Sequence, residues 1–260
     1  MNDKICKVFK AFSICFIVIS LVCVALNFFG TKKLLIKWIE NATNSSFECE
    51  VDCCFSIGQN CKTAYHIDRH GKRFQAAPLD WMRDYSLDTV LHLFESKFSD
   101  FFEEIDEVEP WPGEVNARSV KDTKNGILSI HHFLYGKPLD EEKERFRNTM
   151  KHRAKKVDEI IQNSDSVALI YSREDLQHSI PDNKKFIDFA KKFSKIYPGK
   201  KIYFIIVKIS NINGIQRHVL FKKDNVKVVS FTFYDVGTDW TGNHNMWDKV
   251  MNHIKLVKES

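Results

Sequence analysis

The chain has 260 residues, of which 43% are hydrophobic and 28% charged, a balance that is ordinary for a globular protein with one substantial domain. Its net charge is +5, and lysines alternate with acidic residues along the sequence. A nucleic-acid-binding groove gathers basic residues on one face beside stacking aromatic side chains. The interleaved pattern does not indicate such a groove, so we expect no nucleic-acid partner.

The first predicted element is an apolar segment near the N-terminus. No charged residue occurs from Ala11 to Thr31, and about 20 apolar residues are enough to cross the hydrocarbon core of a bilayer. Residues 1–31 therefore predict a cytoplasmic tail and an uncleaved, single-pass membrane anchor, with residues 11–30 in contact with the membrane. A cleaved signal peptide, with Cys23-Val24-Ala25 as its cleavage site, is the alternative and would make the protein secreted.

Residues 32–48 form a polar stalk in this prediction, and residues 49–260 form the folded domain. Lysines flank the apolar segment on both sides, so the positive-inside rule gives no clear orientation. Two tripeptides that begin at Asn41 and Asn44 have the pattern of glycosylation acceptors. They favour a lumenal or extracellular location for the domain.

The chain has seven cysteines, and none follows Cys61. In an oxidising compartment Cys49, Cys53 and Cys54 would be able to form disulfides among themselves. Their concentration at the start of the domain argues against a disulfide framework for the whole of it. No cysteine or histidine pairs show the spacing of a zinc site, so we expect neither a metal nor another cofactor.

Apolar segments alternate with amphipathic segments through the rest of the chain. This alternation predicts an α/β fold with a mixed, mainly parallel sheet that helices flank on both faces. The predicted strands are 51–57, 126–133, 166–172, 201–209, 218–223 and 227–236. The predicted helices are 61–70, 86–102, 139–162, 182–196 and 243–257.

The turn Gly58-Gln59-Asn60-Cys61 joins a predicted strand to a predicted helix, with Asn60 as the expected N-cap. Unpaired backbone N–H groups at a helix N-terminus favour a thiolate over a thiol and stabilise an oxyanion. Cys61 is therefore a candidate nucleophile, with Gln59 and Asn60 as neighbours of the oxyanion site and of the substrate. The alternative is a buried structural thiol that follows two ordinary turn residues.

A cysteine nucleophile needs a base, and His131 and His132 are the candidates. They end the apolar run "GILSIHHF", and a histidine at the end of a strand is able to face Cys61 across a sheet. One of the two is the predicted general base. The alternative is a pair of partly exposed loop imidazoles without a catalytic role.

The segment "SIGQNCKTAYHIDRHGKRFQAAPLDWM" resembles the signature of an uncharacterised family of papain-like cysteine peptidases. That signature joins a strand, a Gly-x-x-Cys turn, a helix that ends near glycine, and a Pro-Phe-Asp-Trp motif, in which Leu79 here replaces Phe. The segments "FESKFSDFF", "NGILSIHHF" and "SVALIYSRED" resemble later family motifs more loosely, so the resemblance covers roughly residues 51–210.

The resemblance implies a papain-like thiol hydrolase domain in which Cys61 is the nucleophile and His131 the base. His132 stands where the family tends to have Asp, so another residue must orient the imidazole. Asp80 is the predicted orienting residue, because a carboxylate fixes a histidine tautomer; the alternative is that Asp80 caps a structural turn. Arg73 either binds an anionic group of the substrate or pairs with an acidic residue.

The predicted function is thus attack of the Cys61 thiolate on a carbonyl group of an unidentified protein, peptide or glycan substrate. Two alternatives stay open. The same thiol serves an acyl- or glycan-modifying transferase, because the second acceptor decides between hydrolysis and transfer. A non-catalytic binding or scaffold domain also fits, since a fold does not determine a function.

Overall fold

The computed structural model describes residues 49–58, 60–173, 182–237 and 239–257. Glu48–Ser260 is one compact unit. The predicted anchor, the stalk with Asn41 and Asn44, and Gln59 all lie outside the described residues. Within the described ranges, no helix combines the length and the apolar character that crossing a membrane requires.

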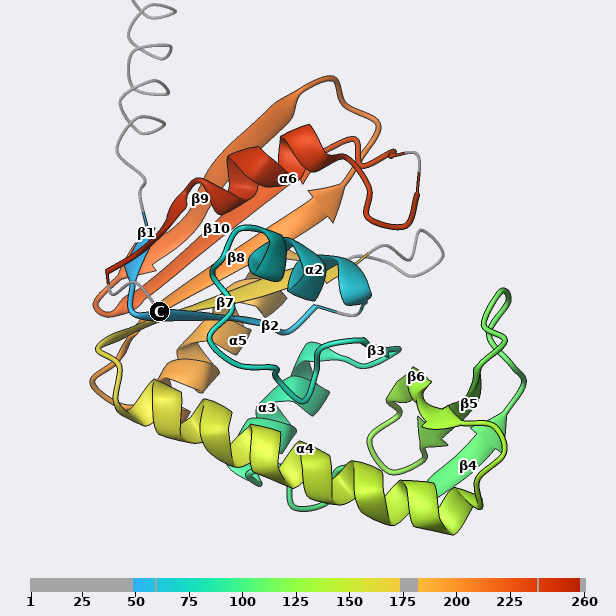
Figure 1. The fold of residues 1–260 in the computed structure, drawn as a ribbon. Coiled ribbons are helices and arrows are strands. Elements are labelled where there is room, and N and C mark those ends of the chain that lie inside the picture. Colours follow the sequence, from blue (N-terminus) through green and yellow to red (C-terminus); the bar gives the residue numbers. More distant parts are fainter. Residues whose placement is uncertain (1–48, 59, 174–181, 238, 258–260) are drawn as a thin grey trace, which may run out of the picture. The chain divides into compact units, whose positions relative to one another are not determined.

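A five-stranded sheet forms the centre of the domain, in the order β2-β7-β8-β10-β9 (Figure 1). The first four strands in this order are parallel, and β9 runs antiparallel to β10. This mixed, mainly parallel sheet agrees with the prediction. Its central strands are apolar and largely buried, as expected for a sheet that is covered on both faces. The strands are β2 (Cys53–Ser56), β7 (Ser166–Arg173), β8 (Lys201–Ile209), β9 (Ile215–Lys223) and β10 (Val226–Phe233).

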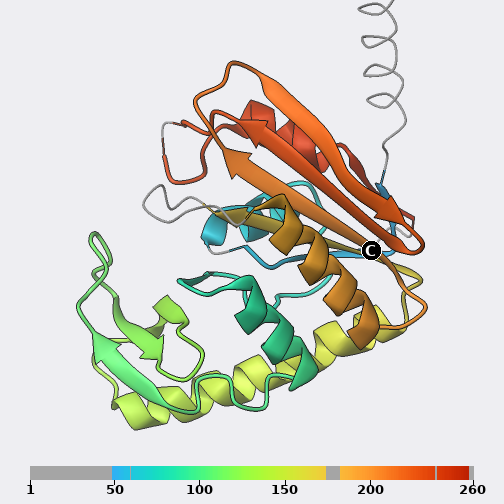
Figure 2. The ribbon, with the colours of Figure 1, turned by 180° about the vertical axis from the view of Figure 1, so that it is seen from behind.

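Helices cover both faces of this sheet. In Figure 1, α2 (Cys61–Arg69) and α6 (His244–Met251) lie in front of it, and α5 (Asn183–Ile196) lies behind it. Figure 2 shows the opposite face, where α5 crosses the strands next to α3 (Leu87–Glu95). The long helix α4 (Leu139–Gln162), which the sequence predicts with these bounds, runs along one side of the domain.

A second, four-stranded sheet has the order β3-β6-β5-β4 and is antiparallel throughout. Only its strand β6 (Leu128–Leu134) is predicted by the sequence pattern. The other three strands are short and carry many polar residues, so they show no hydrophobic periodicity from which the sequence would predict them. They are β3 (Met82–Arg83), β4 (Ile105–Val108) and β5 (Ala117–Asp122). This sheet contacts α4 through β6 and carries half of the candidate site described below.

Three predicted elements differ most from the structure, whereas the ends of most others shift by one to three residues. The predicted helix 86–102 ends at Glu95, because the chain then turns through left-handed conformations that bury Phe98, Phe101 and Phe102 in the core. The predicted helix 243–257 ends at Met251, and β11 (Ile254–Leu256) pairs instead with β1 (Cys49–Val51). The predicted strand 51–57 is divided at Asp52, whose carboxylate accepts hydrogen bonds from the N–H groups of Asp165 and Ser166.

The disulfides that Cys49, Cys53 and Cys54 would be able to form are not present in the described part of the chain, where all four cysteines are free and buried. Cys53 lies against Ser164 and the carbonyl of Ser166, whereas Cys54 faces the carbonyl of Lys72. Burial raises the pKa of Cys53 to about 11 and that of Cys54 to about 12, and burial also raises the pKa of Cys49. These three groups are therefore neutral thiols at physiological pH.

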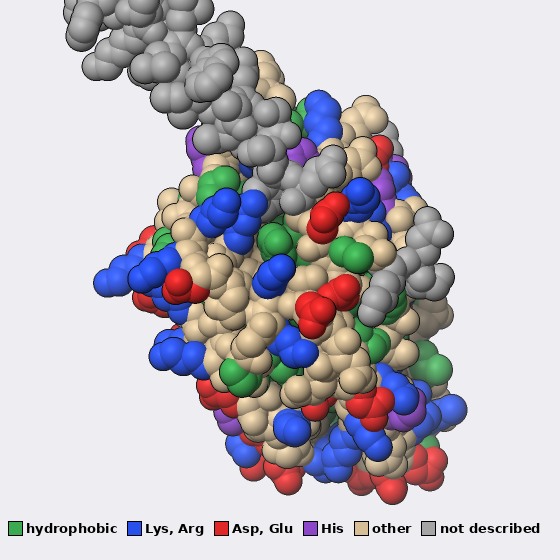
Figure 3. Space-filling view, turned by 90° about the vertical axis from the view of Figure 1, so that its left-hand side faces the viewer, with side chains coloured by type: hydrophobic (Ala, Val, Ile, Leu, Met, Phe, Trp, Pro, Cys, Tyr) green, Lys and Arg blue, Asp and Glu red, His purple; other side chains and the backbone are tan. Residues whose placement is uncertain are grey.

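The surface is polar and mixed in charge. On the visible part of the face in Figure 3, Lys and Arg side chains intermingle with Asp and Glu, so that no patch of a single sign stands out there.

Candidate active site

Cys61 is the first residue of α2 and follows the turn that leaves β2. Asn60 caps the helix: its backbone is extended, and its Oδ1 atom accepts a hydrogen bond of 3.0 Å from the Lys62 N–H group. Gly58 precedes them at a close approach, where an added Cβ atom would lie 2.8 Å from the backbone nitrogen of Ser172. The turn therefore holds the Cys61 sulfur at the end of the helix.

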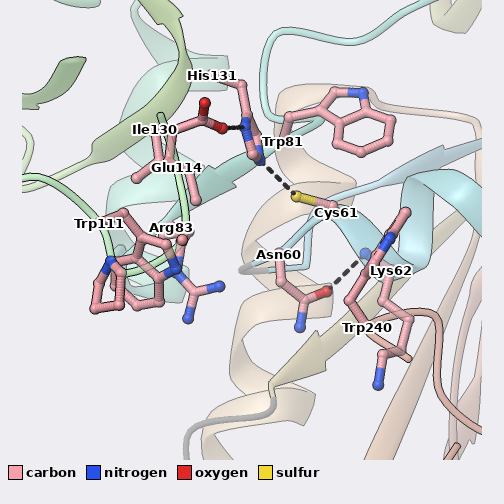
Figure 4. Close-up of a pocket in the computed structure, with 12 residues that line it drawn as sticks. Asn60, Cys61, Lys62, Trp81, Arg83, Trp111, Glu114, Ile130, His131 and Trp240 are labelled. Atoms are coloured by element: carbon pink, nitrogen blue, oxygen red, sulfur yellow. Dashed lines mark hydrogen bonds and ion pairs between the residues drawn. The ribbon is translucent and has the colours of Figure 1, made fainter. Parts of the chain in front are cut away.

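His131 faces Cys61 from the other sheet. Its Nε2 atom lies 3.6 Å from the Cys61 Sγ atom, within the reach of a sulfur hydrogen bond. Its Nδ1 atom lies 2.8 Å from an Oε2 atom of Glu114, which stands in the loop between β4 and β5 (Figure 4). The sulfur, the imidazole and the carboxylate thus form a continuous chain of three groups.

The electrostatics of this chain fix the imidazole tautomer. Hydrogen bonds from the Asn116 N–H group and from His131 lower the pKa of Glu114, so that it is ionised at neutral pH. An ionised carboxylate only accepts hydrogen bonds, so the Nδ1 atom of His131 carries the hydrogen. The Nε2 lone pair of a neutral His131 then points at the thiol.

The predicted orienting residue, Asp80, has a different place. It is 3% exposed, and its Oδ2 atom accepts hydrogen bonds from Arg73 at 2.7 Å and from the Ala77 N–H group at 2.9 Å. Burial raises the pKa of Asp80, and the Arg73 guanidinium opposes that change. The structure thus places Glu114, and not Asp80, beside His131. Asp80 caps a turn and Arg73 pairs with an acidic residue, which are the alternatives stated for these two residues above.

His132 points to the other side of β6. Its Nδ1 atom lies 2.9 Å from the Ser129 hydroxyl, and its ring packs against Phe146. Burial, with the charge of Arg153 as a second cause, lowers the pKa of His132 to about 3. Of the two adjacent histidines, the one that faces the sulfur is His131, whereas His132 is partly buried and packs against α4 as a neutral imidazole.

Cys61 and His131 open into a cleft of about 390 Å³. Three tryptophans line it, namely Trp81, Trp111 and Trp240. Trp81 has a left-handed backbone, with φ of 69°, and its indole meets the His131 ring edge to face at 6.2 Å. Asn60, Lys62, Arg83 and Glu114 are among the polar residues of the lining.

Sequence reasoning missed Glu114 and the tryptophans of the cleft. Pro110-Trp-Pro-Gly113 reads as a loop, and Glu114 follows it as one of several acids without a local pattern. In the part of the chain that the structure describes, no group of three His, Cys, Asp or Glu side chains is placed to hold a metal ion.

Comparison with models of protein families gives one match, which covers residues 52–209. The matching family is described as "Putative papain-like cysteine peptidase (DUF1796)". The matched region contains Cys61, Glu114 and His131. Searches of curated proteins and of solved structures gave no match.

Proposed function

The chain belongs to this family of papain-like cysteine peptidases, and on that premise we propose that it is a thiol hydrolase with Cys61 as nucleophile, His131 as general base and Glu114 as the residue that orients His131. One observation carries the proposal: three residues from separate elements meet in the order that a nucleophile, its base and an orienting acid require.

The geometry supports the following steps. The Nε2 atom of His131 takes the thiol proton, and the Cys61 sulfur attacks the substrate carbonyl, forming a C–S bond and an oxyanion. The oxyanion collapses, the bond to the leaving group breaks, and His131 returns the proton to that group. Water, deprotonated by His131, then hydrolyses the thioester and restores the thiol.

The helix N-terminus supplies donors for the oxyanion. Cys61 is the first residue of α2, where the backbone N–H groups of the first turn have no partners within the helix. The Asn60 side chain lines the same cleft as Cys61. The Asn60 Nδ2 atom is buried and has no hydrogen-bond partner. A buried amide donor without a partner is costly in a folded protein, and an oxyanion that forms during the reaction would satisfy it.

The test is the rate of Cys61 alkylation by iodoacetamide as a function of pH, followed in the full chain by mass spectrometry of the peptide that contains Cys61. We expect half-maximal reactivity well below the value of about 8.5 for an ordinary thiol, because the imidazolium of His131 stabilises the thiolate. The substitution His131→Ala should abolish this advantage.

The matched control is His218→Ala, which removes an exposed histidine of β9 and should change nothing. Slow alkylation with an ordinary pH dependence, indifferent to His131→Ala, would contradict the proposal. Cys61 would then be a structural thiol, and the domain would be a binding or scaffold module.

A further inference from the structure

We propose that the cleft selects substrates that carry a carboxylate close to the reacting carbonyl, and that Arg83 binds this carboxylate. The inference rests on the proposed function, because it assigns the substrate class of the same site. Arg83 lies on β3 and lines the cleft that contains Cys61 and His131.

Arg83 is held in place without being neutralised. Its guanidinium lies over the Trp111 ring, 4.1 Å from the ring centroid. Its Nε atom is buried and has no hydrogen-bond partner, and no ion pair joins Arg83 to any residue in the described ranges. The stacking orients the guanidinium, because a cation is attracted to the face of an indole ring. The N–H groups of the guanidinium stay available to a ligand.

The other charged groups of the cleft already have partners. The Lys62 Nζ atom lies 2.7 Å from an Oδ2 atom of Asp235, in a pair that is buried on both sides. Glu114 accepts hydrogen bonds from His131 and from the Asn116 N–H group. Among the described residues that line the cleft, Arg83 is therefore the charged group that has only an aromatic contact.

The free donors of the cleft favour an anion. Figure 4 shows Arg83 beside Trp111 on one side of the cleft, with Cys61 on the other side. The Asn60 Nδ2 atom, which also has no partner, is the proposed oxyanion donor, so Arg83 is the group left for a carboxylate of the substrate. A planar guanidinium matches a carboxylate with two parallel hydrogen bonds. A cleft with unpaired donors and occupied carboxylates therefore fits a substrate with a carboxylate better than a neutral one.

The decisive experiment compares two reagents of nearly equal size on the full chain. Iodoacetate carries a carboxylate and iodoacetamide carries an amide, while in both cases the Cys61 sulfur forms a bond to carbon and iodide leaves. The measured quantity is the ratio of the two rate constants at Cys61, obtained from peptide mass spectrometry.

We expect Arg83→Gln to lower the iodoacetate-to-iodoacetamide ratio at least about tenfold, the effect of one charge-assisted hydrogen bond. Arg83→Lys keeps the positive charge but loses the planar guanidinium group that forms two parallel hydrogen bonds, and it should lower the ratio less. The matched control is Arg118→Gln: the Arg118 guanidinium also lies over an aromatic ring, that of Tyr135 at 5.7 Å, but it is not part of the cleft, so the ratio should not change. His131 is intact in all three variants, so its effect on the negatively charged reagent is the same in each and does not change the comparison of the ratios.

Protection from iodoacetamide then identifies the source of the carboxylate. Acetyl-Ala-Asp-Ala-amide carries it on a side chain, acetyl-Ala-Ala-Ala carries it at the C-terminus, and acetyl-Ala-Asn-Ala-amide is neutral. One of the two anionic peptides should protect Cys61, and protection should be lost in Arg83→Gln. A ratio that Arg83→Gln leaves unchanged would overturn this inference alone, provided that alkylation still depends on His131. Loss of that dependence would overturn the proposed function as well.

Discussion

Glu114 and His131 are joined by a hydrogen bond of 2.8 Å although 17 positions and the whole of β5 separate them in the chain. By resemblance, related sequences tend to have Asp next to the histidine, where this chain has His132. The structure places an acid beside His131 from a neighbouring loop instead. The change at position 132 therefore does not leave the imidazole without an orienting carboxylate.

Replacing Glu114 tests this relationship. Glu114→Gln keeps the size of the side chain but removes its charge, and so weakens the stabilisation of a His131 imidazolium. One charge-assisted hydrogen bond is worth about 1.5–3 kcal/mol, so the pH of half-maximal Cys61 alkylation should rise by about one unit or more. Because the pKa of Glu114 is lowered, the wild-type chain should keep this contact throughout the neutral range. The control is Glu109→Gln, which changes an exposed acid at the start of the same loop. Equal profiles for the two variants would refute the role of Glu114.

Asn60→Ser separates the oxyanion donor from the helix cap. Serine is also a good N-cap, so α2 keeps its start, but the amide donor is lost. Acylation of Cys61 by 4-nitrophenyl acetate, followed by release of 4-nitrophenolate, should slow by about 10²–10³-fold, as expected for the loss of one oxyanion donor. Alkylation by iodoacetamide forms no oxyanion and should keep its rate. A parallel decrease of both rates would instead indicate a displaced sulfur.

Gly58→Ala tests the turn that presents Cys61. The new Cβ atom would lie 2.8 Å from both the Ser172 backbone nitrogen and the Thr63 hydroxyl, so the backbone must move. We expect a loss of about 1–3 kcal/mol in the free energy of unfolding by urea, the usual cost of overpacking, and a slower alkylation of Cys61. Gly71→Ala is the control: its φ of +63° makes alanine unfavourable there too, but no atom lies within 4 Å. It should reduce stability while Cys61 reacts at the wild-type rate, and equal effects on Cys61 would argue against the close approach at Gly58.

Two histidines, the buried His66 and the partly buried His132, should make the domain less stable in mild acid. Burial lowers the pKa of His66 to about 4 and that of His132 to about 3, from an ordinary value of 6.5. Between these values the unfolded chain binds protons that the folded chain does not. The two histidines therefore do not reduce the free energy of unfolding above about pH 6.5, and they reduce it progressively as the pH falls below that value. Each histidine contributes a slope of at most about 1.4 kcal/mol per pH unit.

Urea denaturation between pH 4.5 and 7.5 measures this slope. His132→Gln should reduce the slope of the free energy of unfolding against pH by the contribution of one histidine. His218→Gln changes an exposed position of β9 and should leave this slope unchanged. An unchanged slope in His132→Gln would show that His132 becomes protonated without unfolding.

Local sequence pattern determined much of the scaffold. Helix 139–162 and strand 201–209 have the predicted bounds, because their apolar periodicity and length are properties of consecutive residues. The same holds for Cys61 at the start of a helix, since the glycine, the N-cap and the strand before it are all local signals. The residues alone left His131 and His132 as candidates, and the family resemblance implied His131. In the structure, side chains alternate along β6, and His131 is the one that faces Cys61.

Tertiary structure decided the partners. Nothing in the sequence distinguishes Glu114 from Glu109, because they stand at the two ends of the same Pro-Trp-Pro-Gly segment. Only the pairing of β4, β5 and β6 brings Glu114 to His131. Asp80 has the favourable local motif, yet a carboxylate that is buried needs a cation, and Arg73 provides it. Arg83 on β3 likewise meets Trp111, which lies in the loop between β4 and β5. A sequence pattern shows which groups are present, but the contacts between distant groups depend on strand pairing and burial, which are properties of the whole fold.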